Sequence, residues 1–464
     1  MTHVVIIGAG PGGYEAALVA AQLGAQVTVI DRDGPGGSAV LTDCVPSKTL
    51  IATADLLAVM ADAGSLGIRV HGEALRAGTL SVDMPAINHR VKELAAAQSR
   101  DIAARLERDG VTYVRGHGRL ESTTRVIADT ADGARAFDAD VVLLATGARP
   151  RVLADAQPDG ERILTWDQVY DLDCVPERLI VVGSGVTGAE FASAYHALGA
   201  NVVLVSSRDR VLPGEDPDAA AVIEDAFTSR GMTVLERSRA AGVRRTESGV
   251  VVSLGDGREV EGSHVLLALG SIPNTEGLGL AEAGVDLDDR GFIVVDRVSR
   301  TSARGVYAAG DCTGVLMLAS VAAMQGRIAM WHALGDSVGP LDRTHVSSTV
   351  FTTPEIATVG VTQREVDEGA VSAESVLLPL GTNARAKMQD IKHGFVKLFC
   401  RPRSRIVIGG VVVGPRASEL IHPITVAVDA RLTVDQLAST FTVYPSLSGS
   451  IAEAARRLHR SAED

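Results

Sequence analysis

The sequence has few aromatic residues, few cysteines and no regular cysteine spacing. Aromatic residues make up 3% of the 464 residues, whereas glycine occurs 48 times and hydrophobic residues make up 46%. This composition favours an α/β protein with many glycine turns and cores of Ala, Val and Leu. Four scattered cysteines in a chain of this length favour a reducing cytoplasm over a disulfide scaffold.

Basic residues are also outnumbered. With 44 Lys and Arg against 57 Asp and Glu, the net charge is −13, which argues against nucleic acid and anionic membrane surfaces as partners. A membrane-spanning helix needs about 20 residues, and no uncharged run in the sequence is that long. The apolar residues 4–7 lack the charged region and the cleavage site that flank the apolar part of a secretory signal. The scattered histidines show no metal-ligand spacing, so we expect small-molecule partners and no metal.

The chain opens with a glycine-rich dinucleotide-binding motif. A buried strand is predicted over residues 4–7, and Gly8, Gly10 and Gly13 follow it at the start of a helix. The first two glycines allow a tight turn and close approach of a pyrophosphate to the helix N-terminus, and the third allows close packing of helix on strand. The second strand ends in Asp31, a typical acceptor for the hydroxyls of an adenosine ribose. Together these features predict dinucleotide binding.

The same motif recurs near residue 180. A buried strand leads into Gly183, Gly185 and Gly188, and a helix and a second strand follow. Each repeat also closes on a further buried strand that ends in glycine, Gly147 in the first and Gly270 in the second. A duplicated unit with two matching loops indicates an enzyme with two dinucleotide sites rather than two accidental glycine turns.

The end of the second repeat's strand bears on the choice of nicotinamide nucleotide. NAD sites carry an acid there for the 2′-hydroxyl, whereas NADP sites carry cations for the 2′-phosphate. Ser206 holds the acid position, and Arg208 and Arg210 follow it. We therefore expect NADPH to be accepted at least as well as NADH, with Arg208 or Arg210 near the phosphate. The alternative is that both arginines are solvated loop residues.

Residues 36–48 read Gly-Gly-Ser-Ala-Val-Leu-Thr-Asp-Cys-Val-Pro-Ser-Lys. This stretch resembles the redox-active helix of the flavoprotein disulfide reductases, the family of lipoamide dehydrogenase and glutathione reductase, whose pattern is Gly-Gly-Thr-Cys-x-Asn-x-Gly-Cys-x-Pro-Ser-Lys. Ala39 stands where that family has its first cysteine, and Cys44 matches the second. Because a dithiol needs two sulfurs within bonding distance, the usual dithiol chemistry is not expected.

The resemblance implies roles for the residues that remain. A helix predicted over residues 47–60 would place Cys44 just before its N-terminus, where the dipole and Lys48 favour a thiolate. An inert, half-buried cysteine fits the local sequence equally well. In the family the matching cysteine lies against the flavin, and the matching lysine pairs with a glutamate near flavin N5. Glu190 matches that glutamate, so the resemblance implies a pair between Lys48 and Glu190.

The resemblance also covers Asp311 after a buried strand, because the matching family aspartate bonds the ribityl chain of FAD. The positions expected for FAD are Gly8, Gly10, Gly13, Asp31, Gly37, Ser38, Lys48, Gly118, Thr146, Gly147, Asp311 and Ala319. The positions expected for the nicotinamide nucleotide are Gly183, Gly185, Gly188, Glu190, Ser206, Arg208 and Gly270.

The C-terminal part resembles the family's dimerisation domain, which implies a homodimer by analogy. Antiparallel strands and two helices are predicted there, and residues 451–459 are predicted as a surface helix. The family's acid-base motif His-Pro-Thr-x-x-Glu is replaced by Tyr444-Pro-Ser-Leu-Ser-Gly449. A tyrosine with a pKa near 10 does not shuttle protons around neutrality as histidine does, so the thiol half of the family's machinery is missing here too.

The predicted fold is α/β, with two Rossmann-like FAD/NAD(P)-binding domains and a C-terminal α+β dimerisation domain. The expected boundaries are 1–150 and 276–340 for the two parts of the FAD domain, 151–275 for the NAD(P) domain and 341–464 for the dimerisation domain.

The expected function is that of a cytoplasmic, FAD-dependent NAD(P)H oxidoreductase. Hydride would pass from NADPH or NADH to FAD and on to a quinone-like acceptor, without a redox-active disulfide. Cys44 and Tyr444 of the partner subunit would line the acceptor pocket. The alternatives are a soluble pyridine nucleotide transhydrogenase and a redox-sensing flavoprotein that does not turn over.

Overall fold

The computed structural model describes residues 1–74 and 80–459. Its elements are mixed α/β, which confirms the predicted class. The chain forms two compact units, of which the first comprises Met1–Thr49, Ala86–Arg151 and Ser271–Asp342. The second comprises Leu50–Pro85, Val152–Gly270 and Arg343–Asp464. The four-part division expected from the sequence stays a prediction.

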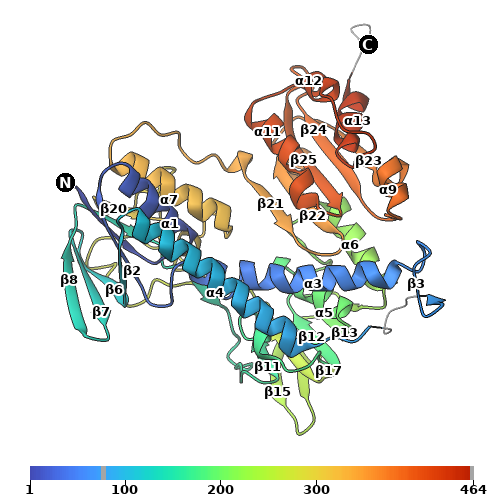
Figure 1. Ribbon diagram of the computed structural model, residues 1–464, viewed down its shortest axis with the longest axis horizontal. Helices are drawn as coiled ribbons and strands as arrows, with labels where there is room; N and C mark the ends of the chain where they lie inside the picture. Colours follow the sequence, from blue (N-terminus) through green and yellow to red (C-terminus); the bar gives the residue numbers. More distant parts are fainter. Residues whose placement is uncertain (75–79, 460–464) are drawn as a thin grey trace. The chain divides into compact units, whose positions relative to one another are not determined.

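The first unit is built on a five-stranded parallel sheet in the order β20-β9-β1-β2-β5. Its strands are β1 (His3–Ile7), β2 (Gln26–Asp31), β5 (Thr112–Arg115), β9 (Val141–Leu144) and β20 (Val306–Ala308). They are rich in Val, Ile and Leu because both faces of a parallel sheet are covered. Helices α1 (Pro11–Gln22) and α7 (Ala319–Ala333) lie side by side (Figure 1). A Cβ on Gly326 would stand 2.1 Å from the Gly12 carbonyl oxygen, so glycine permits this close packing.

The remaining elements of the first unit surround this sheet. They are α2 (Gly37–Leu41), the start of α3 (Cys44–Asp62), most of α4 (Met84–Arg108), the antiparallel sheet β6 (His117–Ser122), β7 (Arg125–Thr130) and β8 (Gly133–Asp138), the pair β10 (Ala148–Pro150) and β19 (Ser271–Pro273), and the 3₁₀ turn η2 (Asp311–Thr313). Helix α3 begins at Cys44, so the predicted start at residue 47 was wrong. Pro46 therefore lies in the first turn of α3, a position that does not require its missing N–H.

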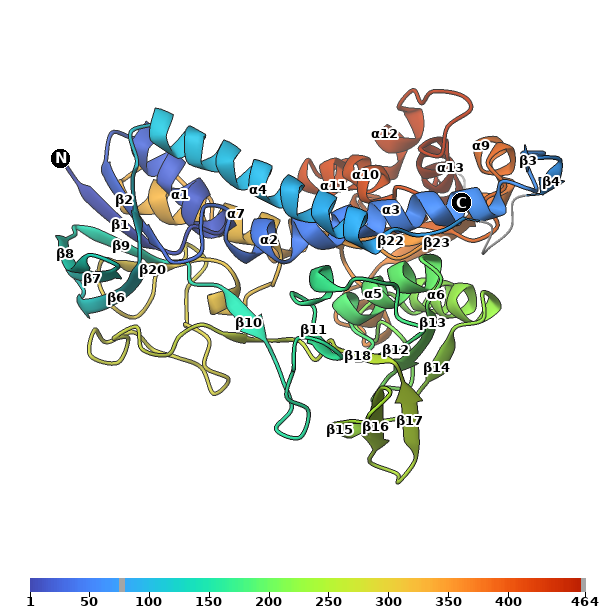
Figure 2. The same ribbon diagram turned by 60° about the horizontal axis from the view of Figure 1, so that its bottom comes forward.

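The second unit repeats the pattern of the first. Its parallel sheet has the order β11-β18-β12-β13-β14, and an antiparallel sheet of three strands accompanies it (Figure 2). The strands are β11 (Ile163–Thr165), β12 (Arg178–Val182), β13 (Asn201–Val205), β14 (Thr233–Leu235) and β18 (His264–Leu267), with β15 (Ala240–Arg245), β16 (Val250–Leu254) and β17 (Glu259–Gly262) in the smaller sheet and helices α5 (Val186–Ala197) and α6 (Pro217–Ser229). The repeat in the sequence is thus a repeat in space.

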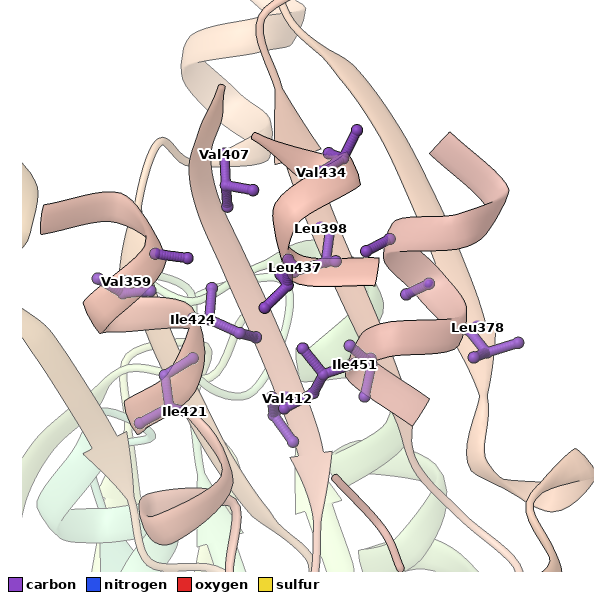
Figure 3. Close-up of a cluster of buried hydrophobic side chains, with 14 of the residues drawn as sticks. Val359, Leu378, Leu398, Val407, Val412, Ile421, Ile424, Val434, Leu437 and Ile451 are labelled. Carbon is purple, nitrogen blue, oxygen red and sulfur yellow. The ribbon is translucent and has the colours of Figure 1, made fainter. Parts of the chain in front are cut away.

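The C-terminal part of the second unit is an antiparallel sheet covered by helices. The sheet order is β21 (Ser347–Val350), β22 (Glu355–Gly360), β25 (Val407–Gly414), β24 (Phe395–Cys400) and β23 (Glu374–Pro379). The helices are α8 (Gln363–Asp367), α9 (Ala384–Met388), α10 (Ala417–Leu420), α11 (His422–Asp429), α12 (Val434–Ser439) and α13 (Gly449–Leu458). Figure 3 shows Ile424, Leu437 and Ile451 from three of these helices directed at the strand that carries Val412.

Two predictions for this part were wrong. More than two helices are present, because helices of four to eight residues are too short to show a clear 3.6-residue period. The last helix, α13, is also not a surface helix, since Ile451, Ala455 and Leu458 are buried in the core while Arg456 and Arg457 are exposed. The short remaining elements are β3 (Arg69–Val70), β4 (Glu73–Ala74), η1 (Val169–Asp171), η3 (Arg343–His345) and η4 (Leu380–Thr382).

One stretch bears on the expected lack of a membrane span. Among the described residues, the helical stretch Gly37–Asp62 is long and apolar enough to cross a membrane by length and composition. Because this stretch contains Asp43, Lys48 and Asp55, it does not contradict the expectation that no uncharged run is long enough to span a membrane. The finding is weak, because helices of proteins without any membrane segment pass this test as well.

Candidate functional site

In the first unit, the loop between β1 and α1 has space for a ligand at one glycine and none at the other two. A Cβ on Gly8 would lie 2.2 Å from the Ala145 carbonyl oxygen, and one on Gly13 would lie 1.9 Å from the Gly8 carbonyl oxygen. At Gly10 a Cβ would have no protein atom within 4 Å. Gly8 and Gly13 are thus required by the packing of the loop itself, whereas Gly10 leaves an open surface at the N-terminus of α1, where a pyrophosphate binds favourably.

The loop between β12 and α5 of the second unit has the same construction. A Cβ on Gly183 would lie 2.1 Å from the Ala268 carbonyl oxygen, and one on Gly188 would lie 1.8 Å from the Gly183 carbonyl oxygen. Gly185, like Gly10, has no protein atom within 4 Å of its Cβ position. The structure therefore presents two open helix N-termini, one in each unit, at the positions that the sequence predicted.

Asp31 at the end of β2 organises the first loop. Its Oδ2 accepts a hydrogen bond from the Ala9 N–H at 2.7 Å, and its Oδ1 accepts from the N–H groups of Asp33 and Gly34 at 2.8 and 2.7 Å. Burial raises the pKa of Asp31, and these three hydrogen bonds oppose the rise. Since a carboxylate has about four acceptor positions, about one remains for a ribose hydroxyl.

Asp311 is the second carboxylate of the first unit's site. Burial and the nearby Asp43 carboxylate raise its pKa to about 6. Within the described part of the chain, no hydrogen bond satisfies the Asp311 carboxylate. The residue is half-buried, and a carboxylate with acceptor positions left open is suited to receive a hydroxyl from a ligand. The backbone beside it is fixed, because the Gly310 N–H donates to Oε1 of Gln325 at 2.9 Å.

The segment Ala-Thr-Gly that follows β9 is held by Asn274. The Thr146 hydroxyl donates to the Asn274 carbonyl at 2.7 Å, and the Asn274 side-chain amide donates to the Thr146 carbonyl at 3.0 Å. Gly147 has a positive φ of 68° with no protein atom near its Cβ position. Gly118 has a packing reason instead, since a Cβ there would meet Ile7 at 2.9 Å. The sequence missed Asn274 because it lies far along the chain from Thr146.

The other positions expected for FAD lie at helix starts. Gly37 and Ser38 open α2, and a Cβ on Gly37 would lie 2.7 Å from Cα of Gly10, so α2 packs directly on the glycine loop. Ala319, another position expected for FAD, is the first residue of α7. Together with Asp31 and Asp311, these positions belong to one unit.

Ser206 differs from the expectation that its side chain faces the ribose. It is 0% exposed, and its hydroxyl lies 2.7 Å from that of Ser184 in the glycine loop and accepts from the Arg208 N–H at 3.1 Å. Its role is to join the glycine loop to the turn after β13. Arg208 is exposed, whereas Arg210 is half-buried and donates to the Pro213 carbonyl at 3.4 Å. The Ser206 side chain therefore faces the protein interior, while the turn that it holds carries the exposed Arg208.

None of the four cysteines forms a disulfide. Cys44 is half-buried at the first residue of α3, and Ala39 lies in α2. Cys312 is fully buried, its thiol donates to the carbonyls of Leu144 and Ala309, and burial raises its pKa to about 11, so it is a packing residue. The described chain therefore contains no dithiol.

Lys48 and Glu190 belong to different units, so their pairing stays a prediction. Lys48 lies in the first turns of α3. Glu190 lies on α5, is 3% exposed, and its Oε1 accepts a hydrogen bond from the Phe351 N–H at 2.9 Å. Gly270, which closes the second repeat, has a positive φ of 82°.

Tyr444 lies in an exposed segment before α13. Its side chain is 85% exposed, and Phe441 and Val443 beside it are exposed as well. The Gly449 N–H donates to Oγ of Ser446 at 3.1 Å, so the position of the missing glutamate has become the start of a helix. No group of three or more His, Cys, Asp or Glu among the described residues is arranged to hold a metal ion.

The residues of the first unit fit FAD. The open surface at Gly10, the remaining acceptor capacity of Asp31 and the half-buried carboxylate of Asp311 match a pyrophosphate, a ribose and a polyhydroxyl chain, respectively. The second unit offers an open pyrophosphate position at Gly185 and an exposed Arg208.

Comparison with known proteins shows the family of this chain. The family model for pyridine nucleotide-disulphide oxidoreductases matches residues 2–326, and the model for the dimerisation domain of these proteins matches residues 346–455. A protein of Mycobacterium tuberculosis named NAD(P)H dehydrogenase (quinone) is 58% identical over 468 residues, covering 99% of this chain and 94% of the relative. A dihydrolipoyl dehydrogenase of Chlamydia pneumoniae is 33% identical over 451 residues, covering 97% and 95%.

Solved structures show the same fold. The crystal structure of LpdA from Mycobacterium tuberculosis superimposes with a TM-score of 0.94 at 57% identity, covering 99% of this chain and 100% of that one. The flavoprotein disulfide reductase RclA of Escherichia coli superimposes with a TM-score of 0.86 at 23% identity over 98% and 99% of the chains, which is a likeness of fold alone.

Proposed function

The chain belongs to the pyridine nucleotide-disulphide oxidoreductase family, and from this premise we propose that it is a flavin-dependent NAD(P)H dehydrogenase that reduces a quinone directly. One observation carries the proposal: Ala39 replaces the family's first redox cysteine, and Cys44 forms no disulfide. With both nucleotide loops retained, electrons still reach the flavin but have no dithiol to continue through. The name of the 58% identical relative supports the same reaction.

The proposed division of labour follows the two units. The first unit binds FAD through the loop at Gly10, with Asp31 at the ribose and Asp311 at the ribityl hydroxyls. The second unit binds the nicotinamide nucleotide through the loop at Gly185. Bound FAD supplies the redox chemistry, accepting a hydride from the nicotinamide and delivering electrons to the quinone. The protein's own tasks are to bind, to orient and to exclude competing reactions.

We propose NADPH as a substrate accepted at least as well as NADH. Position 206 is occupied by Ser and not by the Asp or Glu that is typical of NAD sites. Arg208 is exposed on the turn that Ser206 holds in place. Arg208→Ala is expected to lower kcat/KM for NADPH about ten-fold, the loss of a charge-assisted contact worth about 1.5 kcal/mol, and to leave NADH unchanged. Arg210→Ala is the matched control, since Arg210 is bonded to Pro213. If the kcat/KM for NADPH relative to that for NADH is unchanged in Arg208→Ala, Arg208 does not belong to the site.

The quinone is proposed to dock beside Cys44 and Tyr444 of the partner subunit. The matched dimerisation domain supports a homodimer, and an aromatic side chain suits stacking or a hydrogen bond to a quinone oxygen. Tyr444→Ala is expected to raise KM for quinone without changing flavin reduction by NADPH. Phe441→Ala, a change in the same exposed segment, is the control. Equal quinone kinetics in the two variants would contradict this pocket. A cytoplasmic location stays a prediction.

The decisive experiment follows the flavin of the FAD-loaded protein in two half-reactions. NADPH should bleach the flavin within one turnover, and a soluble naphthoquinone should restore the oxidised spectrum at a comparable rate. Lipoamide and glutathione disulfide should not restore it, even in Ala39→Cys, because Tyr444 and Gly449 still replace the acid-base pair. Fast reoxidation by either disulfide would overturn the proposal.

The same two half-reactions distinguish the proposed function from the two alternatives, a transhydrogenase and a redox-sensing flavoprotein. A transhydrogenase would reoxidise its flavin with an NAD analogue as fast as with quinone. A redox-sensing flavoprotein would bleach but would not be reoxidised quickly by either acceptor.

A further inference from the structure

A buried carboxylate of the second unit is held by a segment more than 150 residues away in the sequence. Glu190 on α5 is 3% exposed, and its Oε1 accepts the Phe351 N–H at 2.9 Å. Burying a carboxylate is costly unless hydrogen bonds compensate it, so this contact also determines where the carboxylate can point. The position of Glu190 therefore depends on how residues 351–353 are held.

Residues 351–353 lie between β21 and β22, outside any regular strand or helix. Their backbone groups consequently bond to side chains instead of to a neighbouring strand. The Thr353 N–H donates to Oγ of Ser193 at 3.1 Å, and the Thr353 carbonyl accepts from Nη1 of Arg230 at 2.9 Å. The Thr353 hydroxyl donates to Oδ1 of Asp55 at 2.5 Å. Thr353 is thus held from three directions.

Two neighbouring side chains of one helix face bind two N–H groups of this segment. Glu190 and Ser193 are three residues apart on α5 and so lie on the same face, about 5–6 Å apart. They accept from the N–H groups of Phe351 and Thr353, respectively. One helix face therefore binds both N–H groups at once, and a shift at Thr353 moves Phe351 as well.

Asp55 and Arg230 complete this clamp with opposite charges. Burial raises the pKa of Asp55, while the Thr353 hydrogen bond and the Arg230 guanidinium lower it. The neighbouring Glu355 carboxyl also faces Asp55, and its own pKa is raised by burial. The Arg230 charge offsets that of the Asp55 carboxyl. All of these residues belong to the second unit, so the clamp is internal to it.

We propose that Asp55, Ser193 and Arg230 are positioning residues for hydride transfer. They fix residues 351–353, and the Phe351 N–H then fixes the Glu190 carboxylate in the nicotinamide half of the enzyme. This inference rests on the proposed function and on the place near flavin N5 that the family resemblance implies for Glu190. The hydrogen bonds of the three residues given above connect them to Thr353, so we expect them to act on the rate of the hydride step and not on nucleotide binding.

The test uses Thr353, which all three residues contact. Thr353→Val removes the hydroxyl bonded to Asp55 and retains the size of the side chain. We expect the rate of flavin reduction by saturating NADPH to fall about ten-fold, because small displacements of groups near the reacting atoms cost one to two powers of ten. The Kd for NADPH should stay within about two-fold, and Thr353→Ser, which keeps the hydroxyl, should restore the rate.

Thr352→Val is the matched control. Thr352 is buried next to Thr353, and its hydroxyl donates to the Pro354 carbonyl rather than to the clamp. It should leave the rate of flavin reduction unchanged. Equal rates in Thr353→Val and Thr352→Val, or no rescue by Thr353→Ser, would overturn the inference.

Ser193→Ala provides a second variant if Thr353→Val does not fold. It removes only the acceptor of the Thr353 N–H and should slow the same step with an unchanged Kd for NADPH. A rate equal to that of the unmodified protein would overturn the inference. Failure of the unmodified, FAD-loaded protein to be bleached by NADPH would instead contradict the proposed function itself.

Discussion

The two glycine loops of this chain are built alike, but the strands beside them end differently. In both loops the first and third glycines are forced by contacts within the protein, and the middle one faces open space. Beside the first loop, β2 ends in Asp31, whose charged carboxylate accepts three backbone N–H groups. Beside the second, the strand β13 is followed by Ser206, a neutral hydroxyl buried against Ser184. The glycine loop is suited to the pyrophosphate, which all dinucleotides have, whereas the residue at the strand end is suited to the ribose, which differs between them.

The comparison also separates structure from binding. Residues that the protein needs for its own packing, such as Gly13 and Gly188, cannot vary whichever nucleotide binds. Residues that face outward, such as Gly10 and Gly185, are required only by a ligand. Substitutions at matched positions should therefore give different losses in the two units, and their order of size is set by the local contacts.

The largest effects are expected at the third glycines. In Gly13→Ala and Gly188→Ala the new Cβ would stand 1.9 and 1.8 Å from a backbone oxygen, which no side-chain movement relieves. Each should lower the free energy of unfolding by about 3 kcal/mol or more, measured by urea denaturation. Gly13→Ala should also yield colourless protein, whereas Gly188→Ala should retain FAD and lose fast reduction by NADPH.

Gly10→Ala and Gly185→Ala are the controls for this pair. Their Cβ positions are open, so unfolding free energies should change little while the affinity for one nucleotide falls in each. A stability loss at Gly10 equal to that at Gly13 would show that the open position is not a ligand surface.

An intermediate effect is expected at the strand ends. Asp31→Ala removes a charged acceptor and leaves the buried Ala9 N–H without a partner, which should cost about 2 kcal/mol of stability. Ser206→Ala removes a neutral acceptor of the Arg208 N–H and should cost about 1 kcal/mol. Thermal unfolding of both variants, monitored by circular dichroism, checks the order. A larger loss at Ser206 than at Asp31 would reverse the comparison.

The smallest effect concerns pH, and Asp311 should produce it. Its pKa is raised to about 6 in the folded chain by burial and by Asp43, against 3.8 for an ordinary aspartate. Ionisation therefore opposes folding of the FAD-free protein, with no penalty below pH about 4 and the full penalty above pH about 6. Asp311→Asn should stabilise FAD-free protein at pH 8 by less than about 1 kcal/mol, because solvent at the half-buried carboxyl screens most of the effect, and this gain should vanish as the pH falls to 4.

The same variant should bind FAD more weakly, so its effects on stability and affinity have opposite signs. Asp132→Asn, in the exposed turn between β7 and β8, is the control and should show neither effect. Destabilisation of the FAD-free protein by Asp311→Asn at pH 8 would mean that its carboxylate is satisfied by the protein.

Much of the fold followed from the sequence because its signals are local. The buried strand predicted over residues 4–7 is β1 (His3–Ile7), and the helix predicted after its glycines is α1 (Pro11–Gln22). The end of β9 and the start of the second repeat were equally clear, since strands covered on both faces are continuous in Val, Ile and Leu. The short helices α10–α12 were missed because four to eight residues do not define a period.

The site was predicted in part for the same reason. Both glycine loops lie between a strand and a helix, as the sequence indicated, while their binding roles stay a prediction. The partners of Ser206 were not predicted, because Ser184 lies on another element. The position of α13 also escaped prediction: residues 451–459 were expected as a surface helix, whereas one face of α13 completes the core around Ile424 and Leu437.

The sequence by itself determined the duplicated dinucleotide motif, the lone thiol at Cys44 and the missing acid-base pair at Tyr444 and Gly449. These features are identities and spacings of neighbouring residues. Only the tertiary structure decided that burial and the nearby Asp43 raise the pKa of Asp311. It also decided that Ser206 is buried and that the Phe351 N–H donates to Glu190. The reason is physical: charge, burial and hydrogen-bond geometry depend on which distant residues the fold brings within a few ångströms, and no local pattern encodes that distance.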